Sequence, residues 1–206
     1  MDRTPTALLS AYSKVNVDIL GEFLKNAGWN LLGSAGTAKF LNERGIGCRD
    51  VAEIVGPPIL GHRVVTLSRE IHAALLAEDT SEDNAELARI GVPRIDLVYV
   101  NLYPLEAEIA RPGATMRDVI EKTDIGGPTL LRSAAKGRRL VICRPEDIEK
   151  VMDYIMGMRA PMVRPHMEAK AERFVSLLVA IAEAEVGKYC SHSAMYHQRY
   201  SNVPQE

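Results

Sequence analysis

Cysteine is scarce in this chain, and its placement excludes a disulfide-stabilised fold. The three cysteines, Cys48, Cys143 and Cys190, are odd in number and far apart, with no C-x-x-C spacing, so we expect reduced thiols. Cys190 lies near His192 and His197, which could be drawn as a set of metal ligands. A fourth ligand is missing and the spacing matches no common zinc pattern. We therefore predict no metal site.

Long apolar runs and an excess of basic charge are also lacking. No stretch approaches the roughly 20 apolar residues that a membrane span needs, and the first residues do not have the basic segment and apolar core of a signal peptide. The 25 basic residues face 27 acidic ones, for a net charge of −2, which argues against a nucleic-acid surface. We expect a cytoplasmic protein that binds neither membranes nor nucleic acids, while a local pocket remains free to bind a small anion.

The composition is that of an ordinary globular protein. The 206 residues are 47% hydrophobic and 25% charged, which fits one domain, or one domain with a helical appendage, and argues against two independent domains. We predict a domain over residues 1–160, a helical extension over 161–200 that packs on the domain or on a partner subunit, and a tail at 201–206.

Short apolar segments alternate with amphipathic helical patterns over the first hundred residues. This alternation indicates parallel strands joined by crossover helices, and so an α/β fold. The predicted strands are 7–9, 29–32, 95–100 and 140–143. Four helices are predicted by pattern: one that contains Val17, Leu20 and Leu24, one over residues 39–44, one that begins at Pro145, and one over residues 167–188.

Two other segments have distinct patterns. Residues 56–68 contain prolines and glycines that predict an irregular connection, of the kind that often carries function. The helix at 167–188 has an apolar stripe of Phe174, Leu177, Leu178 and Ile181, which favours packing on the domain or on a second subunit over cofactor binding. From this stripe we predict a homodimer.

Three segments follow predicted strands: the turn after Leu9, the turn 34–37, and residues 101–104. Ligands bind at the carboxyl edge of an open parallel sheet, so these three segments are expected to converge. No G-x-G-x-x-G or P-loop pattern occurs, which favours a monophosphate over a dinucleotide or a triphosphate.

The turn 34–37 has the features of a phosphate site. Ser34 and Thr37 have hydroxyl donors, Gly36 allows close approach of the backbone, and a helix that begins there has free N–H groups. A simple N-cap is the alternative, because Ser and Thr are the usual caps. Lys14, across from this turn, supplies the positive charge that favours the phosphate site.

The segment 124–136 combines a turn, a helix start and two opposite charges. Gly126-Gly127 permits unusual backbone conformations, Pro128 suits a first helical position, and the helix has unpaired N–H groups at its start that suit an anion. Asp124 and Lys136 lie roughly three turns apart, so they meet only if the chain folds back or a ligand lies between them. The alternative is a helix entry with a surface lysine.

Four segments together resemble one known family. The segment 124–136, Asn101-Leu102-Tyr103-Pro104, the run 34–39 and Pro112-Gly113 are similar in order and separation to the IMP cyclohydrolase domain of the bifunctional purine-biosynthesis protein. The resemblance covers roughly residues 6–160, with a looser continuation through the last helix. It implies a Rossmann-like three-layer sandwich with a mainly parallel sheet, similar to methylglyoxal synthase, plus a C-terminal helix.

The resemblance also implies a reaction. The carboxamide nitrogen of a formamido-imidazole ribonucleotide attacks the formyl carbon, and loss of water gives IMP. This ring closure needs no metal, redox group or other cofactor. The expected ligand is a purine ribonucleotide monophosphate, and a separate formyltransferase is the expected partner, since the transformylase half of the bifunctional protein is absent from this sequence.

The site residues fall into two groups. One group is expected to carry the chemistry, by orienting and deprotonating the amide, stabilising the oxyanion and moving protons: Lys136, Asp124, Tyr103 and Asn101. The other group is expected to bind the phosphate and the rest of the nucleotide: Ser13, Lys14, Ser34, Gly36, Thr37, Arg63, Thr66, Ile125, Gly126 and Gly127.

The chain departs from the family pattern in two loops. The family's Ser-Asp-Lys-Thr-Gly is replaced by residues 12–16, which keep only Lys14, and Ala35 replaces a glycine of the second loop. The family's Arg-Val-Lys-Thr-Leu-His is replaced by a segment that has Val65 and Ser68 at the lysine and histidine positions. Three hypotheses stay open: an active cyclohydrolase, a nucleotide-binding subunit without turnover, and a related cyclisation of another ribonucleotide.

Overall fold

A parallel sheet lies at the centre of the computed structural model, which describes residues 3–61 and 63–201. Its five strands pair in the order β3-β2-β1-β4-β5, and each pair is parallel. The strands are β1 Thr6–Ala11, β2 Asn30–Gly33, β3 Arg49–Asp50, β4 Leu97–Asn101 and β5 Leu140–Ile142. The α/β class and the Rossmann-like architecture predicted from the sequence are confirmed.

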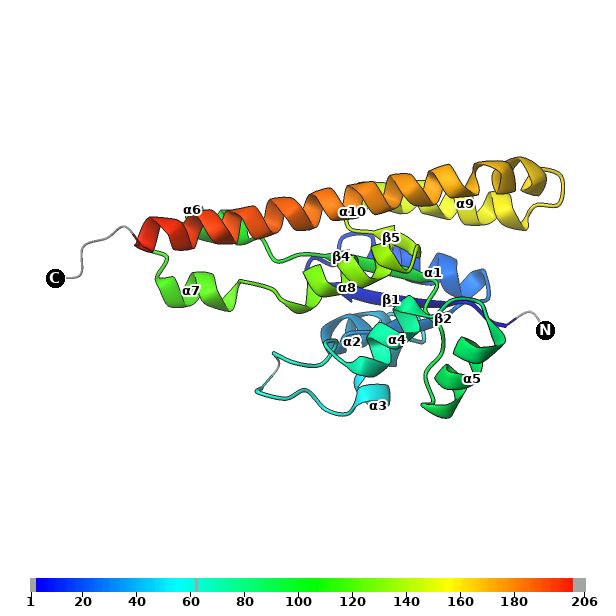
Figure 1. Ribbon diagram of the computed structural model, residues 1–206, viewed down its shortest axis with the longest axis horizontal. Coiled ribbons are helices and arrows are strands. Elements are labelled where there is room, and N and C mark those ends of the chain that lie inside the picture. The colour runs from blue at the N-terminus through cyan, green and yellow to red at the C-terminus, as the bar shows by residue number, and fades with distance from the viewer. Residues whose placement is uncertain (1–2, 62, 202–206) are drawn as a thin grey trace.

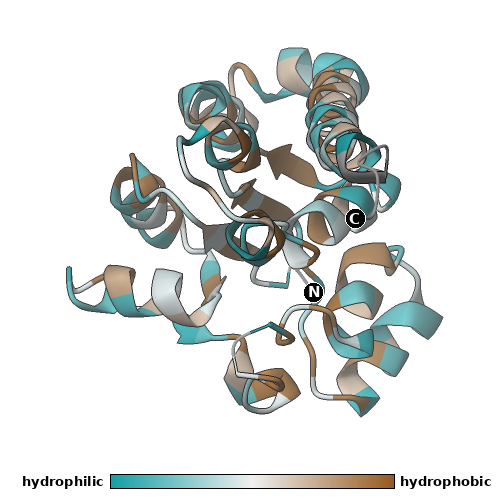
Figure 2. Cartoon of the chain, turned by 90° about the vertical axis from the view of Figure 1, so that its left-hand side faces the viewer, coloured by the Kyte–Doolittle hydropathy of each residue, from teal (hydrophilic) through white to brown (hydrophobic). Residues whose placement is uncertain are grey.

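Helices cover both faces of the sheet, because alternate residues of each buried strand point to opposite sides. The helices of these two layers are α1 Val17–Asn26, α2 Ala35–Asn42, α4 Arg69–Leu76, α8 Gly126–Lys136 and α9 Ile148–Arg159. On one face Leu9 and Tyr99 pack in a core with α1, α2 and α9, and on the other face Leu8 and Val98 pack with α4 and α8. Burying one such aliphatic side chain contributes about 1.5–3 kcal/mol. Figure 2 shows the apolar strands enclosed by helices whose outer faces are hydrophilic.

Five further helices connect these elements, and the sequence patterns did not predict most of them. The helix Ser81–Arg89 has a single buried residue, Leu87, and the other four have six residues or fewer, too few for an apolar period to stand out. The strand β3, with two residues, escaped prediction for the same reason. The short helices are α3 Ala52–Val55, α5 Ser81–Arg89, α6 Leu105–Ala110, α7 Met116–Glu121 and the 3-10 turn η1 Pro145–Asp147.

The C-terminal helix α10, Arg164–Ser201, is 38 residues long and runs along the whole molecule (Figure 1). Leu178 packs in the core of one sheet face, while Ala182 and Val186 pack in the other, so α10 covers the β5 edge. In the part of the chain that the structure describes, no helix has the length and apolar character that crossing a membrane would demand.

The apolar stripe predicted on this last helix is only partly buried. Leu178 is 2% exposed and Phe174 stacks on Tyr154 with ring centroids 4.4 Å apart, but Leu177 is 52% exposed. The stripe therefore packs on the domain, and Leu177 lies outside it because one residue turns a helix by about 100°. The helix also extends past the predicted end at 188, and residues 202–206 of the predicted tail lie outside the described residues.

The helix α2 begins at Ala35, four residues before the predicted start at 39. Ser34 is its N-cap in an extended conformation, and its carbonyl accepts from Thr37 N–H at 2.7 Å and from Ala38 N–H at 2.8 Å. The predicted turn 34–37 is therefore the cap and first turn of the helix. The segment 34–37 was predicted as the turn into this helix, so only the start of the helix was placed wrongly.

The connection 56–68 is irregular, as predicted. In its described residues an antiparallel bridge pairs Ile59 with Val64, and Gly56 and Gly61 have φ angles of 89° and 77°. Such positive φ angles suit glycine, which has no Cβ to clash. The connection ends at Ser68, the N-cap of α4, whose side chain accepts from Ile71 N–H at 3.1 Å.

Candidate functional site

A pocket of about 470 Å³ lies at the carboxyl ends of β1, β2 and β4. The chain order reverses at this edge, since β2 and β4 lie on opposite sides of β1, and such switch points are where ligands bind in α/β sheets. The three segments predicted to converge do so here. The pocket is lined by Ser10, Ala11, Tyr12, Ser34, Arg63, Val65, Thr66, Asn101, Tyr103, Ile120, Glu121, Thr123, Asp124, Ile125, Gly126 and Gly127.

Asp124 is the carboxylate of this pocket that has an altered acidity. It precedes α8, and its Oδ1 accepts from Gly127 N–H at 3.1 Å. Burial raises the pKa of Asp124, and hydrogen bonds from the N–H groups of Gly127 and Gly126 oppose that rise. A half-buried carboxylate with a raised pKa binds a proton more tightly than an ordinary carboxylate does, which suits it to accept a proton from a substrate.

The glycine pair at the start of α8 is required by close packing. A Cβ added to Gly127 would lie 2.4 Å from Asp124 Oδ2 and 2.7 Å from Leu102 Cδ2, and one added to Gly126 would lie 2.9 Å from Thr66 Oγ1. Because Gly127 N–H is bonded to Asp124, that group is already satisfied without an anion at the start of α8. Ile125 is 60% exposed and forms part of the apolar lining.

Two tyrosines form an aromatic wall in the pocket. The rings of Tyr12 and Tyr103 have centroids 4.8 Å apart, and Lys122 Nζ lies 5.4 and 5.6 Å from them. The pKa of Tyr103 is raised mainly by burial, and to a smaller extent by the charge of Asp124 and by Tyr12. Its hydroxyl therefore keeps its proton at neutral pH. Tyr12 was not predicted as a site residue, although it directly follows β1 at the ligand edge of the sheet, a position that could have indicated it.

Asn101 has a role within the protein that differs from the predicted one. Its Nδ2 donates to Ser13 O and to Tyr99 Oη, both at 2.8 Å, and its Oδ1 accepts from Ser13 N–H at 2.9 Å. Both amide hydrogens are therefore used in joining the loop after β1 to β4. Asn101 and Ser13 position the pocket wall, and Asn101 has no spare hydrogen to donate to a developing oxyanion.

Thr37 likewise acts inside the fold. It is fully buried, its Oγ1 accepts from Ala11 N–H at 3.0 Å, and Ser34 Oγ lies 3.2 Å away. Only Ser34 of this turn lines the pocket, and its side chain makes no N-cap bond. Gly36 is exposed, with no atom within 4 Å of an added Cβ. The packing of the protein therefore does not require a glycine at this position.

The predicted cationic ligands differ in their access to the pocket. Arg63 lines it, with a side chain 64% exposed and 3.9 Å from Glu121. Lys14 does not line it: its ammonium donates to the carbonyls of Ala11 and Tyr12, and burial lowers its pKa. Of the two, Arg63 is placed to bind an anion in this pocket.

Lys136 lies far from the pocket, contrary to expectation. It is exposed at the last position of α8, whereas Asp124 precedes the first. The continuous 11-residue helix between them is about 16 Å long, so the chain does not fold back. Within one chain these two groups do not flank a ligand, and Lys136 could reach such a pocket only from a second copy.

The two departures from the family pattern have separate structural consequences. Val65 lines the pocket and packs against the core that contains residues of α4, and Ile120 and Ile125 are further apolar residues of the lining. Ser68 has a capping role at the start of α4, so its hydroxyl is used by the fold.

The cysteine and histidines near the C-terminus are spread over α10. Cys190 is exposed, and His192 Nε2 lies 3.7 Å from Glu106 Oε2 on α6. Among the described residues, no group of three or more His, Cys, Asp or Glu side chains is arranged to hold a metal ion.

Comparison with known proteins supports the resemblance noted in the sequence. The MGS-like domain matches residues 18–129. The chain belongs to the MGS-like domain family. This MGS-like chain is 42% identical to the bifunctional purine biosynthesis protein PurH of Aquifex aeolicus (strain VF5) over 151 residues, which are 71% of this chain and 30% of that protein. The chain therefore spans under a third of this relative.

One solved structure resembles the MGS-like chain over nearly its full length. The crystal structure of ForH superposes with a TM-score of 0.76 at 30% sequence identity, covering 95% of this chain and 100% of that one. The likeness extends beyond the matched domain into the region of α10.

Proposed function

We propose that this protein catalyses an IMP cyclohydrolase-type reaction of purine biosynthesis, closing the second ring of a formamido-imidazole-carboxamide ribonucleotide with loss of water. The observation that carries the proposal is the placement of Asp124. This carboxylate with a raised pKa lies in a pocket at the ligand edge of an MGS-like fold, in a chain 42% identical to PurH.

The nucleotide binds with its phosphate toward the polar side of the pocket. Ser34, Thr66 and Arg63 supply two hydroxyl groups and one guanidinium there, which suits a monophosphate and the ribose beside it. The heterocycle then lies near Tyr12, Tyr103 and Asp124. No cofactor takes part. The protein acts as a homodimer, and the formyl group of its substrate comes from a separate formyltransferase.

The chemistry requires orientation and proton transfer, because an amide nitrogen is a poor nucleophile and a formamide carbon is a weak electrophile. Asp124 accepts a proton from the carboxamide nitrogen as that nitrogen attacks the formyl carbon. Tyr103, kept neutral by its raised pKa, donates a proton to the formyl oxygen, which becomes the hydroxyl group of the cyclic intermediate. Asp124 then passes its proton to this hydroxyl, which leaves as water, and the proton lost from the formamido nitrogen as the C=N bond forms returns to Tyr103.

A second candidate is ring closure on a related ribonucleotide with a less polar heterocycle. Val65, Ile120 and Ile125 are apolar residues of the pocket lining, and Val65 stands where the family has a lysine. An apolar lining accepts a substrate that an ammonium group would not favour.

The proposed reaction can be tested directly. Purified protein is mixed with the formamido ribonucleotide, and ring closure is followed by ultraviolet absorbance. Catalysed formation of IMP is the expected result. Tight binding of IMP without turnover would reject the reaction and leave a nucleotide-binding subunit.

Substitution of Arg63 by alanine tests the phosphate-binding side of the pocket. We expect the KM for the ribonucleotide to rise about tenfold with kcat little changed, because a charge-assisted hydrogen bond contributes about 1.5–3 kcal/mol to ground and transition states alike. Arg89→Ala is the control, since Arg89 is exposed and pairs with Glu86 on α5. An unchanged KM in Arg63→Ala would remove Arg63 from the phosphate site.

A further inference from the structure

We propose that Tyr189 of α10 is a positioning residue that holds Asp124 in its catalytic orientation. This inference rests on the proposed function for the meaning of "catalytic", while its structural part concerns the loop that precedes α8. It makes the C-terminal helix a part of the active site, although the matched MGS-like domain ends at residue 129.

The hydroxyl of Tyr189 bridges two backbone groups of this loop. It accepts from Asp124 N–H at 2.6 Å and donates to Lys122 O at 2.8 Å. The side chain is only 7% exposed, so these bonds are shielded from competition by water. Burial raises the pKa of Tyr189 to about 12, and the hydroxyl therefore keeps the proton that it donates to Lys122.

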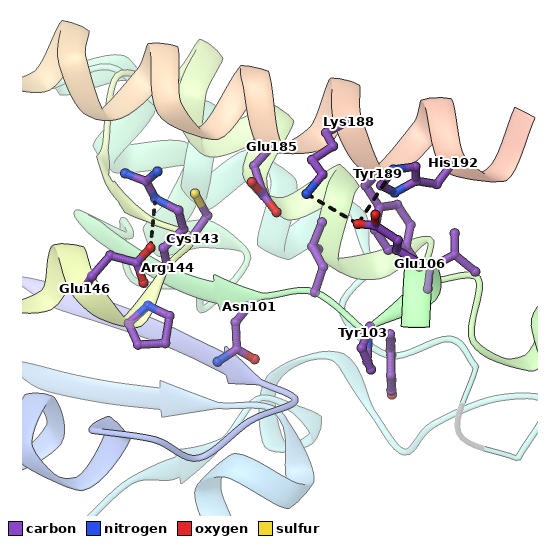
Figure 3. Close-up of a pocket in the computed structure, with 14 residues that line it drawn as sticks. Asn101, Tyr103, Glu106, Cys143, Arg144, Glu146, Glu185, Lys188, Tyr189 and His192 are labelled. Atoms are coloured by element: carbon purple, nitrogen blue, oxygen red, sulfur yellow. Dashed lines mark ion pairs between the residues drawn. The ribbon is translucent and has the colours of Figure 1, made fainter. Parts of the chain in front are cut away.

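The part of α10 that carries Tyr189 is held firmly against the domain. Figure 3 shows Lys188 and His192, on either side of Tyr189, directed toward Glu106 of α6; their nitrogens lie 3.4 and 3.7 Å from its Oε2. Tyr189 packs in a small core with Leu105 and Val119. These contacts dock this part of the helix on α6 and α7, beside the loop that the hydroxyl of Tyr189 binds.

The two backbone groups that Tyr189 binds flank the residue before the catalytic carboxylate. Nearer the helix α7, the loop is held by Thr123 N–H, which donates to Ile120 O at 3.0 Å, and by Thr123 Oγ1, which donates to Val119 O, also at 3.0 Å. Beyond the loop, Asp124 Oδ1 is held by Gly127 N–H. The bond to Tyr189 holds the backbone of Asp124 itself, so its loss lets the carboxylate move toward solvent.

Substitution of Tyr189 by phenylalanine removes the hydroxyl and keeps the ring in its core. In the full chain we expect kcat for ring closure to fall about tenfold, as for the loss of a buried hydrogen bond, with KM little changed. The acid limb of the kcat profile should move to lower pH, because a more hydrated Asp124 has a lower pKa. Amide hydrogen exchange at Asp124 should become faster.

Tyr154→Phe is the matched control, because Tyr154 is also buried but stacks on Phe174 far along α10. It should leave kcat, the pH profile and exchange at Asp124 unchanged. If Tyr189→Phe keeps all three wild-type values, the inference is overturned. If the wild-type protein closes no ring, the proposed function fails, and exchange at Asp124 alone then decides whether Tyr189 holds the loop.

Discussion

Replacing Gly127 by alanine is expected to lower the rate of ring closure at least about a hundredfold. The new Cβ would lie 2.4 Å from Asp124 Oδ2 and 2.7 Å from Leu102 Cδ2, distances that real Cβ contacts do not reach. The carboxylate is the easier of the two to displace, and a shift of about 1 Å in a catalytic group costs on the order of a hundredfold in rate.

The same substitution is expected to destabilise the fold by about 1–3 kcal/mol, the usual cost of inserting a methyl group into a packed site. The pair of measurements is kcat for ring closure and the free energy of unfolding in urea. Gly187→Ala is the matched control, because Gly187 is exposed on α10 and an added Cβ there meets no atom within 4 Å. The control should keep its activity and gain up to about 1 kcal/mol of helix stability.

A Gly127→Ala protein that closes the ring at the wild-type rate would mean that Asp124 tolerates displacement. In that case the carboxylate could not be the group whose geometry sets the rate. A protein that loses stability but keeps its rate would assign Gly127 to packing against Leu102 alone.

The fold could be predicted from the sequence where the apolar pattern is strong. The strands β1, β4 and β5 are short apolar runs in the core of the sheet, and the predicted segments overlap all three. The start of α2 was placed too late, because Gly36 lies within its first turn while Ser34 caps it. The first turn of this helix is defined by backbone hydrogen bonds to the carbonyl of Ser34. The residue types alone do not distinguish such a helical turn from an isolated turn.

The location of the site could also be predicted, since the carboxyl ends of parallel strands share an edge. The roles of individual residues could not. Thr37 and Asn101 were predicted to contact a ligand, but their side chains form hydrogen bonds within the protein. The contacts with Ala11 and Ser13 join segments that only tertiary packing brings together. Tyr189 was not singled out, because its contact with Asp124 joins residues 65 positions apart.

The misplacement of Lys136 has a different origin. Its predicted role came from the family resemblance, which suggests what a residue does but not where its side chain lies relative to the pocket. Once α8 is continuous from Gly126 to Lys136, the helical rise separates the lysine from the pocket. A role for Lys136 in the reaction would therefore require a subunit contact, which connects this residue to the proposed homodimer.

Substitution of Asp124 by asparagine is expected to have the largest effect on activity. Asparagine keeps the shape of the side chain and an oxygen that accepts from Gly127 N–H, but it cannot accept a proton. Loss of a positioned general base costs about 10²–10⁴-fold, so kcat for ring closure should fall by about three orders of magnitude. Binding of IMP should persist, because Arg63, Ser34 and Thr66 are unchanged.

The stability of this variant should move in the opposite direction. Burial raises the pKa of Asp124 above its ordinary value of 3.8, so the native state binds this proton more tightly than the unfolded state does. Its contribution to stability is fully present below pH 3.8 and is lost as the pH rises through the native pKa. At neutral pH the ionised carboxylate therefore costs stability, a cost that asparagine does not have.

We accordingly expect Asp124→Asn to be at least as stable as the wild type at pH 7, with the difference shrinking toward pH 4. Urea unfolding at both pH values measures this, and Asp153→Asn, an exposed substitution on α9, is the control. A variant that is less stable at pH 7 would show that the ionised carboxylate stabilises the start of α8, and its activity loss would then be one of structure. An inactive but stable variant would instead show that burial of the ionised carboxylate costs stability and serves the reaction, because burial raises the proton affinity of the base.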